Sequence, residues 1–189
     1  MNYIKKLGKD SILYGFGTIL AKSVGLITIP IFTRIFTTEI YGRLELLLTM
    51  GAFFVPIIVM GTDSAQSYYF FNFKKNSDDN RKTVIISILF WRIIWGILII
   101  ISFYPVMKYI NNFLFNDAIH SSTFLIILIS SYLTAMVMQF TNLQRLLYKP
   151  KPFIVFSFLL PFLSSVISIL LVLNYDFSYT GVIFGNLIS

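Results

Sequence analysis

The chain has 189 residues, of which 57% are hydrophobic and only 12% charged, and its formal net charge is +7. Soluble domains carry about 25% charged residues, and here the shortfall lies in apolar blocks of about 20 residues, long enough to cross a hydrocarbon core of about 30 Å. The basic residues form short clusters between these blocks, which argues against a nucleic-acid partner. The absence of cysteine excludes disulfides and thiolate metal sites.

The pattern predicts an all-α integral membrane protein, a polytopic bundle of five full transmembrane helices and part of a sixth. We expect one transmembrane domain over residues 1–189, with helices at about 11–32, 44–69, 83–104, 123–143, 153–173 and 180–189. The last run covers only half a span, and a free end inside hydrocarbon would leave backbone carbonyls without partners. The chain therefore looks truncated.

The first helix carries its small or polar residues at helical spacing on one face: Ser11, Gly15, Thr18, Lys22 and Gly25. Small residues let neighbouring helices approach closely in lipid, so we expect this face to look into the bundle. Pro30 lies near the outer end of this helix, and a turn over 33–43 follows. Pro56 should bend the second helix, and a polar loop over 72–82 precedes the third.

The later segments add further polar stripes. A loop over 108–122 contains the only histidine, and the inner half of the fourth helix is rich in hydroxyls and amides. A basic hinge over 145–152 precedes the fifth helix, whose small or polar residues again fall on one face: Ser157, Pro161, Ser164 and Ser168.

Loop charges predict the orientation. With a cytoplasmic N-terminus, ten cations lie inside, namely Lys5, Lys6, Lys9, Lys74, Lys75, Arg81, Lys82, Arg145, Lys149 and Lys151. Only three lie outside, namely Arg34, Arg43 and Lys108. This excess follows the positive-inside rule.

Two cations remain within the predicted spans. Lys22 lies roughly 16 Å and Arg92 roughly 14 Å along their helices, at 1.5 Å per residue, so both are expected at one depth. A buried charge at mid-membrane costs about 2.5–3.5 kcal/mol on insertion scales and therefore needs a reason. One reason is a wet cavity for an anion, because guanidinium grips phosphate bidentately and Lys acts as a point charge.

The structural alternatives stay open. Lys22 could instead reach Asp63 and form a buried ion pair, and Arg92 could stack on Trp95 or extend toward the inner headgroups. Asp63 could also carry a coupling proton or sodium ion, since intramembrane carboxylates mark relays in transporters. Glu45, near the outer interface, is expected to pair with Arg43 or Arg34.

Catalytic motifs are missing from the sequence. It has no Gly-rich phosphate loop, HExxH motif or nucleophile elbow, and His120 has no second His or Cys nearby to hold a metal. We therefore expect neither an enzyme nor a cofactor.

A motif at the end of the first helix resembles one known family. Pro30, Thr33, Arg34, Glu39, Tyr41 and Gly42, with Gly17-Thr18 before them, resemble the bacterial polysaccharide-biosynthesis transporters that flip lipid-linked oligosaccharide repeat units. These belong to the multidrug, oligosaccharidyl-lipid and polysaccharide exporter superfamily. A basic residue inside the first helix of that family matches Lys22. The later spans resemble the family only in length and polarity.

The resemblance implies a two-lobe transporter of twelve to fourteen helices, of which this chain would be the first lobe. The expected function is to flip an undecaprenyl-pyrophosphate-linked oligosaccharide across the bacterial inner membrane. Lys22 and Arg92 would hold the anion, and Asp63 would couple a proton or sodium ion. The expected partners are this lipid-linked substrate, the bilayer and a second lobe. The alternatives are a multidrug or cation antiporter, a membrane acyl- or glycosyltransferase using His120 with Asp117, and a non-transporting scaffold.

Overall fold

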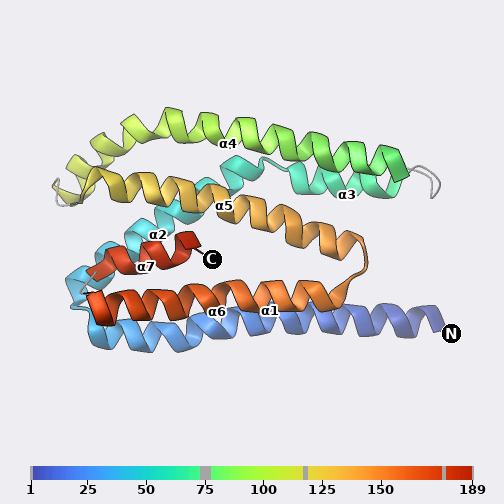
Figure 1. Cartoon of the computed structure of the whole chain (residues 1–189), viewed down its shortest axis with the longest axis horizontal. Helices are drawn as coiled ribbons and strands as arrows, with labels where there is room; N and C mark the ends of the chain where they lie inside the picture. Colours follow the sequence, from blue (N-terminus) through green and yellow to red (C-terminus); the bar gives the residue numbers. More distant parts are fainter. Residues whose placement is uncertain (1, 73–77, 117–118, 176–177, 189) are drawn as a thin grey trace. The chain divides into compact units, whose positions relative to one another are not determined.

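The computed structural model describes residues 2–72, 78–116, 119–175 and 178–188. Within these ranges the chain is helical and contains no strand (Figure 1). The helices are α1 Asn2–Ile35, α2 Thr38–Val59, α3 Thr62–Asn72, α4 Asp78–Phe115, α5 Ser121–Leu146, α6 Pro150–Tyr175 and α7 Ser178–Ile188. The predicted all-α class is confirmed.

Five segments of the described chain are long and apolar enough to cross a membrane. They are Ser11–Ile35, Thr38–Asn72, Asp79–Met107, Ser121–Leu146 and Pro150–Asn174. These match the five predicted spans in order and approximate position, and α7 coincides with the partial sixth. Many large apolar side chains on these segments are exposed, as expected for helices that face lipid. The chain is therefore a helical membrane protein.

The second span is interrupted, which the sequence analysis did not predict. α2 ends at Val59 and α3 begins at Thr62, because Met60 and Gly61 both adopt left-handed backbone angles, with φ of 46° and 72°. A glycine in this conformation commonly ends a helix. Pro56, where we predicted a bend, lies inside α2, and its carbonyl still accepts the N–H of Met60 at 2.9 Å. The interruption thus comes one turn after the proline.

Two predicted loops are mostly helical. The turn predicted over 33–43 reduces to Phe36 and Thr37, where the Thr37 hydroxyl accepts the N–H of Ile40 at 3.4 Å and caps α2. The loop predicted over 108–122 is helical as far as Phe115, since neither proline nor glycine interrupts that stretch.

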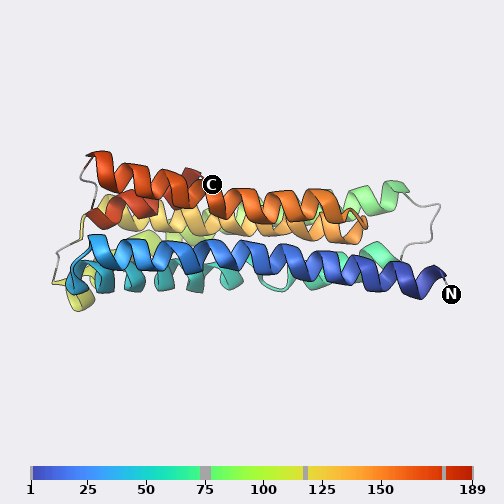
Figure 2. The ribbon, with the colours of Figure 1, turned by 90° about the horizontal axis from the view of Figure 1, so that it is seen from below.

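The described chain divides into two compact units, residues 1–47 with 141–189 and residues 48–140. In the first unit, α6 packs along α1 and against α7 (Figures 1 and 2). Gly17 allows a close approach, because a Cβ there would lie 3.1 Å from Ile154. α7 approaches α6 more closely still at Gly185, beside Ser164 and Ser168. The prediction that residues 1–189 form one lobe stays a prediction.

The contact face of α1 differs from the predicted one. α6 meets the side of α1 that carries Tyr14 and Gly17, and Tyr14 packs edge-on against Phe153 with ring centroids 5.1 Å apart. The predicted packing face is exposed at Ser11, Gly15, Thr18, Lys22 and Gly25. Our prediction of the helix–helix contact was therefore wrong for this pair. The buried Gly17, rather than the stripe of small residues, provides the close contact.

The second unit contains α3, α4, most of α5 and the end of α2. Gly51 of α2 lies against α5, and its carbonyl accepts the Ser131 hydroxyl at 2.8 Å. Gly96 of α4 lies directly under the Tyr132 ring of α5. These close contacts bring α2, α4 and α5 together around the interruption in the second span.

Candidate functional site

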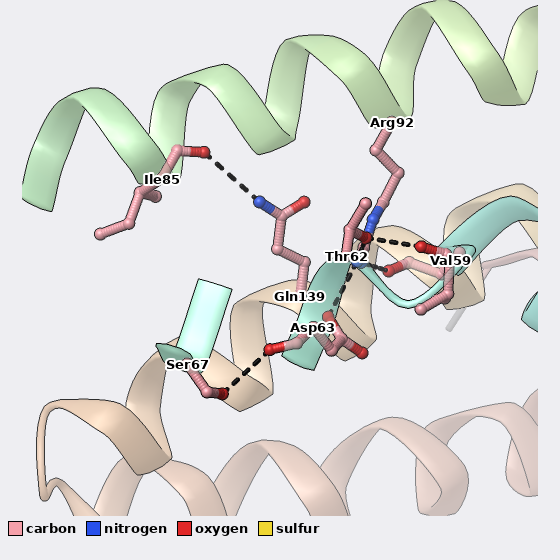
Figure 3. Close-up of polar contacts among 8 residues, drawn as sticks. Val59, Thr62, Asp63, Ser67, Ile85, Arg92 and Gln139 are labelled. Atoms are coloured by element: carbon pink, nitrogen blue, oxygen red, sulfur yellow. Dashed lines mark hydrogen bonds and ion pairs between the residues drawn. The ribbon is translucent and has the colours of Figure 1, made fainter. Parts of the chain in front are cut away.

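The interruption between α2 and α3 is held by a buried arginine. Arg92 is the fourteenth residue of the 29-residue span Asp79–Met107, close to its middle, and is fully buried. Its Nη2 donates to Thr62 Oγ1 at 2.6 Å and to Asp63 Oδ1 at 2.8 Å (Figure 3). Its Nη1 donates to the Ala135 carbonyl at 2.7 Å. One guanidinium therefore joins the start of α3 to α4 and α5.

A second side chain of α4 holds the other half of the interrupted helix. Trp95, one turn after Arg92, donates its indole N–H to the Ile57 carbonyl at 3.0 Å, near the end of α2. Thr62 links the two halves directly, because its hydroxyl donates to the Val59 carbonyl at 2.6 Å. Helix termini expose backbone groups that lipid cannot satisfy, so these polar contacts make the interruption tolerable at this depth.

The positive charge of Arg92 is neutralised by the carboxylate of Asp63. Its side chain is 0% exposed, whereas that of Asp63 is 27% exposed. Its two terminal nitrogens are bound to protein acceptors, which leaves them poorly placed to grip an anion. In the structure Arg92 links the start of α3 to α5, whereas we predicted that it contacts the substrate. The structure also gives Asp63 a different partner from the Lys22 that we considered.

Trp95 does not serve as the stacking partner that we considered for Arg92. Its ring stacks on Trp91 instead, with centroids 5.9 Å apart and planes 9° from parallel. Both tryptophans therefore lie on α4 beside the interruption, and one of them bonds to it.

Lys22 differs from Arg92 in its surroundings. It lies on α1 near the middle of the span Ser11–Ile35, it is exposed, and no described carboxylate forms an ion pair with it. Lys22 belongs to the first unit and Arg92 to the second, so the predicted cavity shared by the two cations stays a prediction.

The family-motif residues cluster at the connection of α1 and α2. Pro30 lies in the last turns of α1, and its carbonyl accepts the Thr33 hydroxyl at 3.1 Å. Arg34 lies in the last turn of α1 and is exposed. Gly42, in α2, is surrounded by open space, since nothing lies within 4 Å of the position that a Cβ would take there.

The charged and polar side chains at the start of α2 form contacts one helical turn apart. Arg43 bonds to Glu39 at 2.6 Å, one turn earlier. Glu45 hydrogen-bonds to the Tyr41 side chain, again one turn away. Pairs four residues apart share a helix face, so spacing within α2 decided these partners. The structure thus gives the motif residues Glu39 and Tyr41 polar partners within α2.

The remaining sequence candidates give no catalytic arrangement. His120 is exposed before α5, and its carbonyl accepts the N–H of Thr123 at 2.9 Å. Asp117, its predicted companion, lies outside the described residues. Among the described residues, no group of three or more His, Cys, Asp or Glu side chains could hold a metal ion. The side chains of several loop cations also lie outside the described set: Lys5, Lys6, Lys9, Lys74, Lys75 and Lys108. The predicted orientation stays a prediction.

Sequence reasoning missed two members of the site, Thr62 and Ala135, and considered Trp95 only as a stacking partner of Arg92. Gly61-Thr62-Asp63 carries a usable signal, because a glycine that ends one helix is followed by residues that favour the start of another. Ala135 contributes only its carbonyl, so no side-chain pattern could have revealed it.

Comparison with known proteins adds no relative. No family model matches the chain, and no curated protein or solved structure matches it.

Proposed function

We propose that the chain forms part of a bacterial membrane transporter that flips an undecaprenyl-pyrophosphate-linked oligosaccharide across the inner membrane. The observation that carries this proposal is the interrupted second span, held at mid-depth by Arg92. Discontinuous membrane helices are typical of secondary transporters, whose substrate and ion sites lie near the bilayer midplane.

The interruption is suited to movement. Two left-handed residues separate α2 from α3, and each half is tied to α4 by its own side chain, Trp95 or Arg92. Hinges are a few residues at element ends that absorb large backbone changes. Such a hinge allows α3 to move relative to α2 while the helix ends keep polar partners.

The position of Lys22 favours an anionic substrate. An exposed ammonium near the middle of a span is costly in lipid unless it meets water or an opposite charge. A pyrophosphate supplies that charge, while the polyprenyl tail stays in the bilayer. No bond is made or broken in this step. The resemblance of Pro30, Thr33, Arg34, Glu39, Tyr41 and Gly42 to the oligosaccharide-flipping family points to the same substrate class.

The competing functions have weaker support. A cation or drug exporter needs an uncompensated carboxylate in its cavity, and Asp63 is compensated by Arg92. An envelope transferase needs an acid–base pair, and His120 has no described acidic partner.

The experiment replaces Lys22 in the full-length protein and follows surface polysaccharide in a host that lacks the native gene. Lys22→Ala should lower export about 10- to 150-fold, the equivalent of one charge-assisted contact of about 1.5–3 kcal/mol. Lys22→Arg, which keeps the charge, should retain most of it. Lipid-linked oligosaccharide should accumulate on the cytoplasmic leaflet of the Ala variant.

Two matched measurements complete the test. Thr18→Ala, one turn away on the same exposed face, should leave export unchanged. Full export by Lys22→Ala at normal protein abundance would rule out Lys22 as the anion contact. Efflux of cationic dyes without polysaccharide export would favour the exporter instead.

A further inference from the structure

Gln66 is a buried polar residue that the proposed function does not use. It is 0% exposed, and neither its amide nitrogen nor its amide oxygen has a hydrogen-bond partner among the described residues. Buried polar groups in proteins are nearly always hydrogen-bonded, because a lost bond to water must be replaced. A fully buried, unpartnered amide within a membrane span therefore points to a missing ligand.

Two of the other buried polar atoms without a described partner belong to residues that bond around the same part of α4. Gln139 of α5 is 4% exposed and its Oε1 has no partner, while its Nε2 reaches the Ile85 carbonyl only at the long distance of 3.5 Å. The Nε of Arg92 is also buried without a partner within the described chain. Together with the two amide atoms of Gln66, these make two donors and two acceptors.

The contacts on either side place these groups against the same part of α4. On α3, Thr62 bonds to Arg92 and the Phe70 carbonyl accepts Arg81 Nε at 3.1 Å. Gln66 lies one turn from each of them on the same stripe, so it faces α4 between the two arginines. On α5, Ala135 bonds to Arg92, and Gln139, one turn later, reaches Ile85 (Figure 3). Both amides thus meet the segment of α4 from Ile85 to Arg92.

A groove at the same level provides space beside this segment. Its volume is about 310 Å³, and it opens between α3 and α4, lined by Ala65, Tyr69, Thr83, Val84, Ser87 and Ile88. Ala65 directly precedes Gln66, and Ser87 and Ile88 belong to the α4 segment that the amides face.

The chemistry of the unpartnered atoms selects the ligand. An anion needs donors alone and would meet the carbonyl oxygens of the two glutamines. A metal cation needs oxygens alone and would lie beside the guanidinium. Water donates and accepts, and buried waters typically make about three hydrogen bonds to groups of this kind. We propose that Gln66, Gln139 and Arg92 Nε bind internal water, forming a hydrated site between α3, α4 and α5.

This site has a consequence for the hinge. Gln66 lies one turn after Thr62, and Gln139 one turn after Ala135, so each amide stands one turn from a present acceptor of Arg92. Water held there keeps the guanidinium solvated when its bonds to α3 are exchanged. The hydration itself does not depend on which substrate the protein transports.

Hydroxyl-radical footprinting by X-ray radiolysis, read by mass spectrometry, tests the site in the full chain in lipid nanodiscs. Radicals form from bound water and label adjacent side chains even when these are buried. Phe70, one turn from Gln66 and 7% exposed, should be labelled several-fold faster than Phe54 and Phe124, which are 4% and 2% exposed. Equal labelling of the three phenylalanines would mean a dry site and overturn the proposal.

Variants provide the second readout. Gln66→Met and Gln139→Met keep side-chain volume but remove the polar atoms, so Phe70 labelling should fall to the level of Phe54. Gln144→Met, on the same helix as Gln139 but outside the segment that faces Ile85 to Arg92, is the control and should leave it unchanged. Melting temperature should fall in the two site variants, because water loses its partners. A rise in melting temperature in both would show that the amides are dry and unpaired, contrary to the proposal.

Discussion

The buried pair of Arg92 and Asp63 gives the sharpest prediction about stability. Asp63→Leu would leave a guanidinium that is 0% exposed with only the neutral oxygens of Thr62 and Ala135. Breaking a buried pair in this way costs about 3–5 kcal/mol. At about 2–4 °C per kcal/mol for a chain of this size, the melting temperature should fall by roughly 6–20 °C.

The reverse variant should cost less. Arg92→Met leaves Asp63 without its cation, but that carboxylate is 27% exposed and can stay hydrated or take a proton. We expect about 1–3 kcal/mol from the lost hydrogen bonds. The double variant replaces both charges by apolar groups, which is often close to neutral. It should therefore be more stable than Asp63→Leu alone, and the coupling energy should approach the sum of the two single losses, about 4–8 kcal/mol.

Tryptophan fluorescence is the assay, because the only two tryptophans, Trp91 and Trp95, lie on α4 beside the pair. Far-ultraviolet circular dichroism on the same samples should give coincident transitions. The control cycle uses Glu39→Leu and Arg43→Met, an exposed pair whose coupling should stay near 0.3–0.5 kcal/mol. Additive effects of the Asp63 and Arg92 substitutions would refute the reasoning, since independent side chains cannot form a buried pair.

Three further substitutions test the hinge and the helix contacts. Gly61→Ala should lower the free energy of unfolding by about 1–2 kcal/mol, because the φ of 72° is left-handed. Gly25→Ala is the control and should not lower the free energy of unfolding, because open space surrounds Gly25. Gly96→Ala should cost about 1–3 kcal/mol through overlap with the Tyr132 ring, and Tyr132→Leu in the same chain should recover part of the loss. Trp95→Phe should cost about 0.5–1.5 kcal/mol and speed hydrogen exchange in the last turn of α2, which loses a donor. Chemical denaturation measures the first two, and exchange mass spectrometry the third; unchanged exchange would show that the indole does not hold α2.

Most of the fold could be predicted because lipid imposes simple rules on sequence. A span needs a long apolar run, so the five spans and the partial sixth could be recognised by length alone. Boundaries were less accurate where polar residues continue a helix into water. α4 runs on to Phe115 because polar side chains such as Asn111 are compatible with a helix, and hydropathy cannot mark that end.

The site was harder to predict because its partners are set by rotation and depth. Arg92 and Asp63 were both recognised as costly charges, but a single sequence does not fix which faces of two helices meet. One residue of rotation, about 100°, exchanges one partner for another. The interruption at Met60 and Gly61 turns α3 relative to α2, so the faces of α2 cannot be extended by helical spacing to Asp63.

The two cations within membrane spans offset the cost of an intramembrane charge in different ways. Arg92 is long, planar and rich in donors, which suits it to join three helix segments from within a packed core. Lys22 offers one compact charge on an exposed face of α1, where no described side chain neutralises it. Exchanging the two residue types should therefore have unequal effects: Arg92→Lys loses the fixed fork that reaches Thr62, Asp63 and Ala135, whereas Lys22→Arg preserves the charge. If transport persists in Lys22→Arg and is lost in Arg92→Lys, then Lys22 contacts the substrate through its charge and Arg92 supports the helix packing through its geometry.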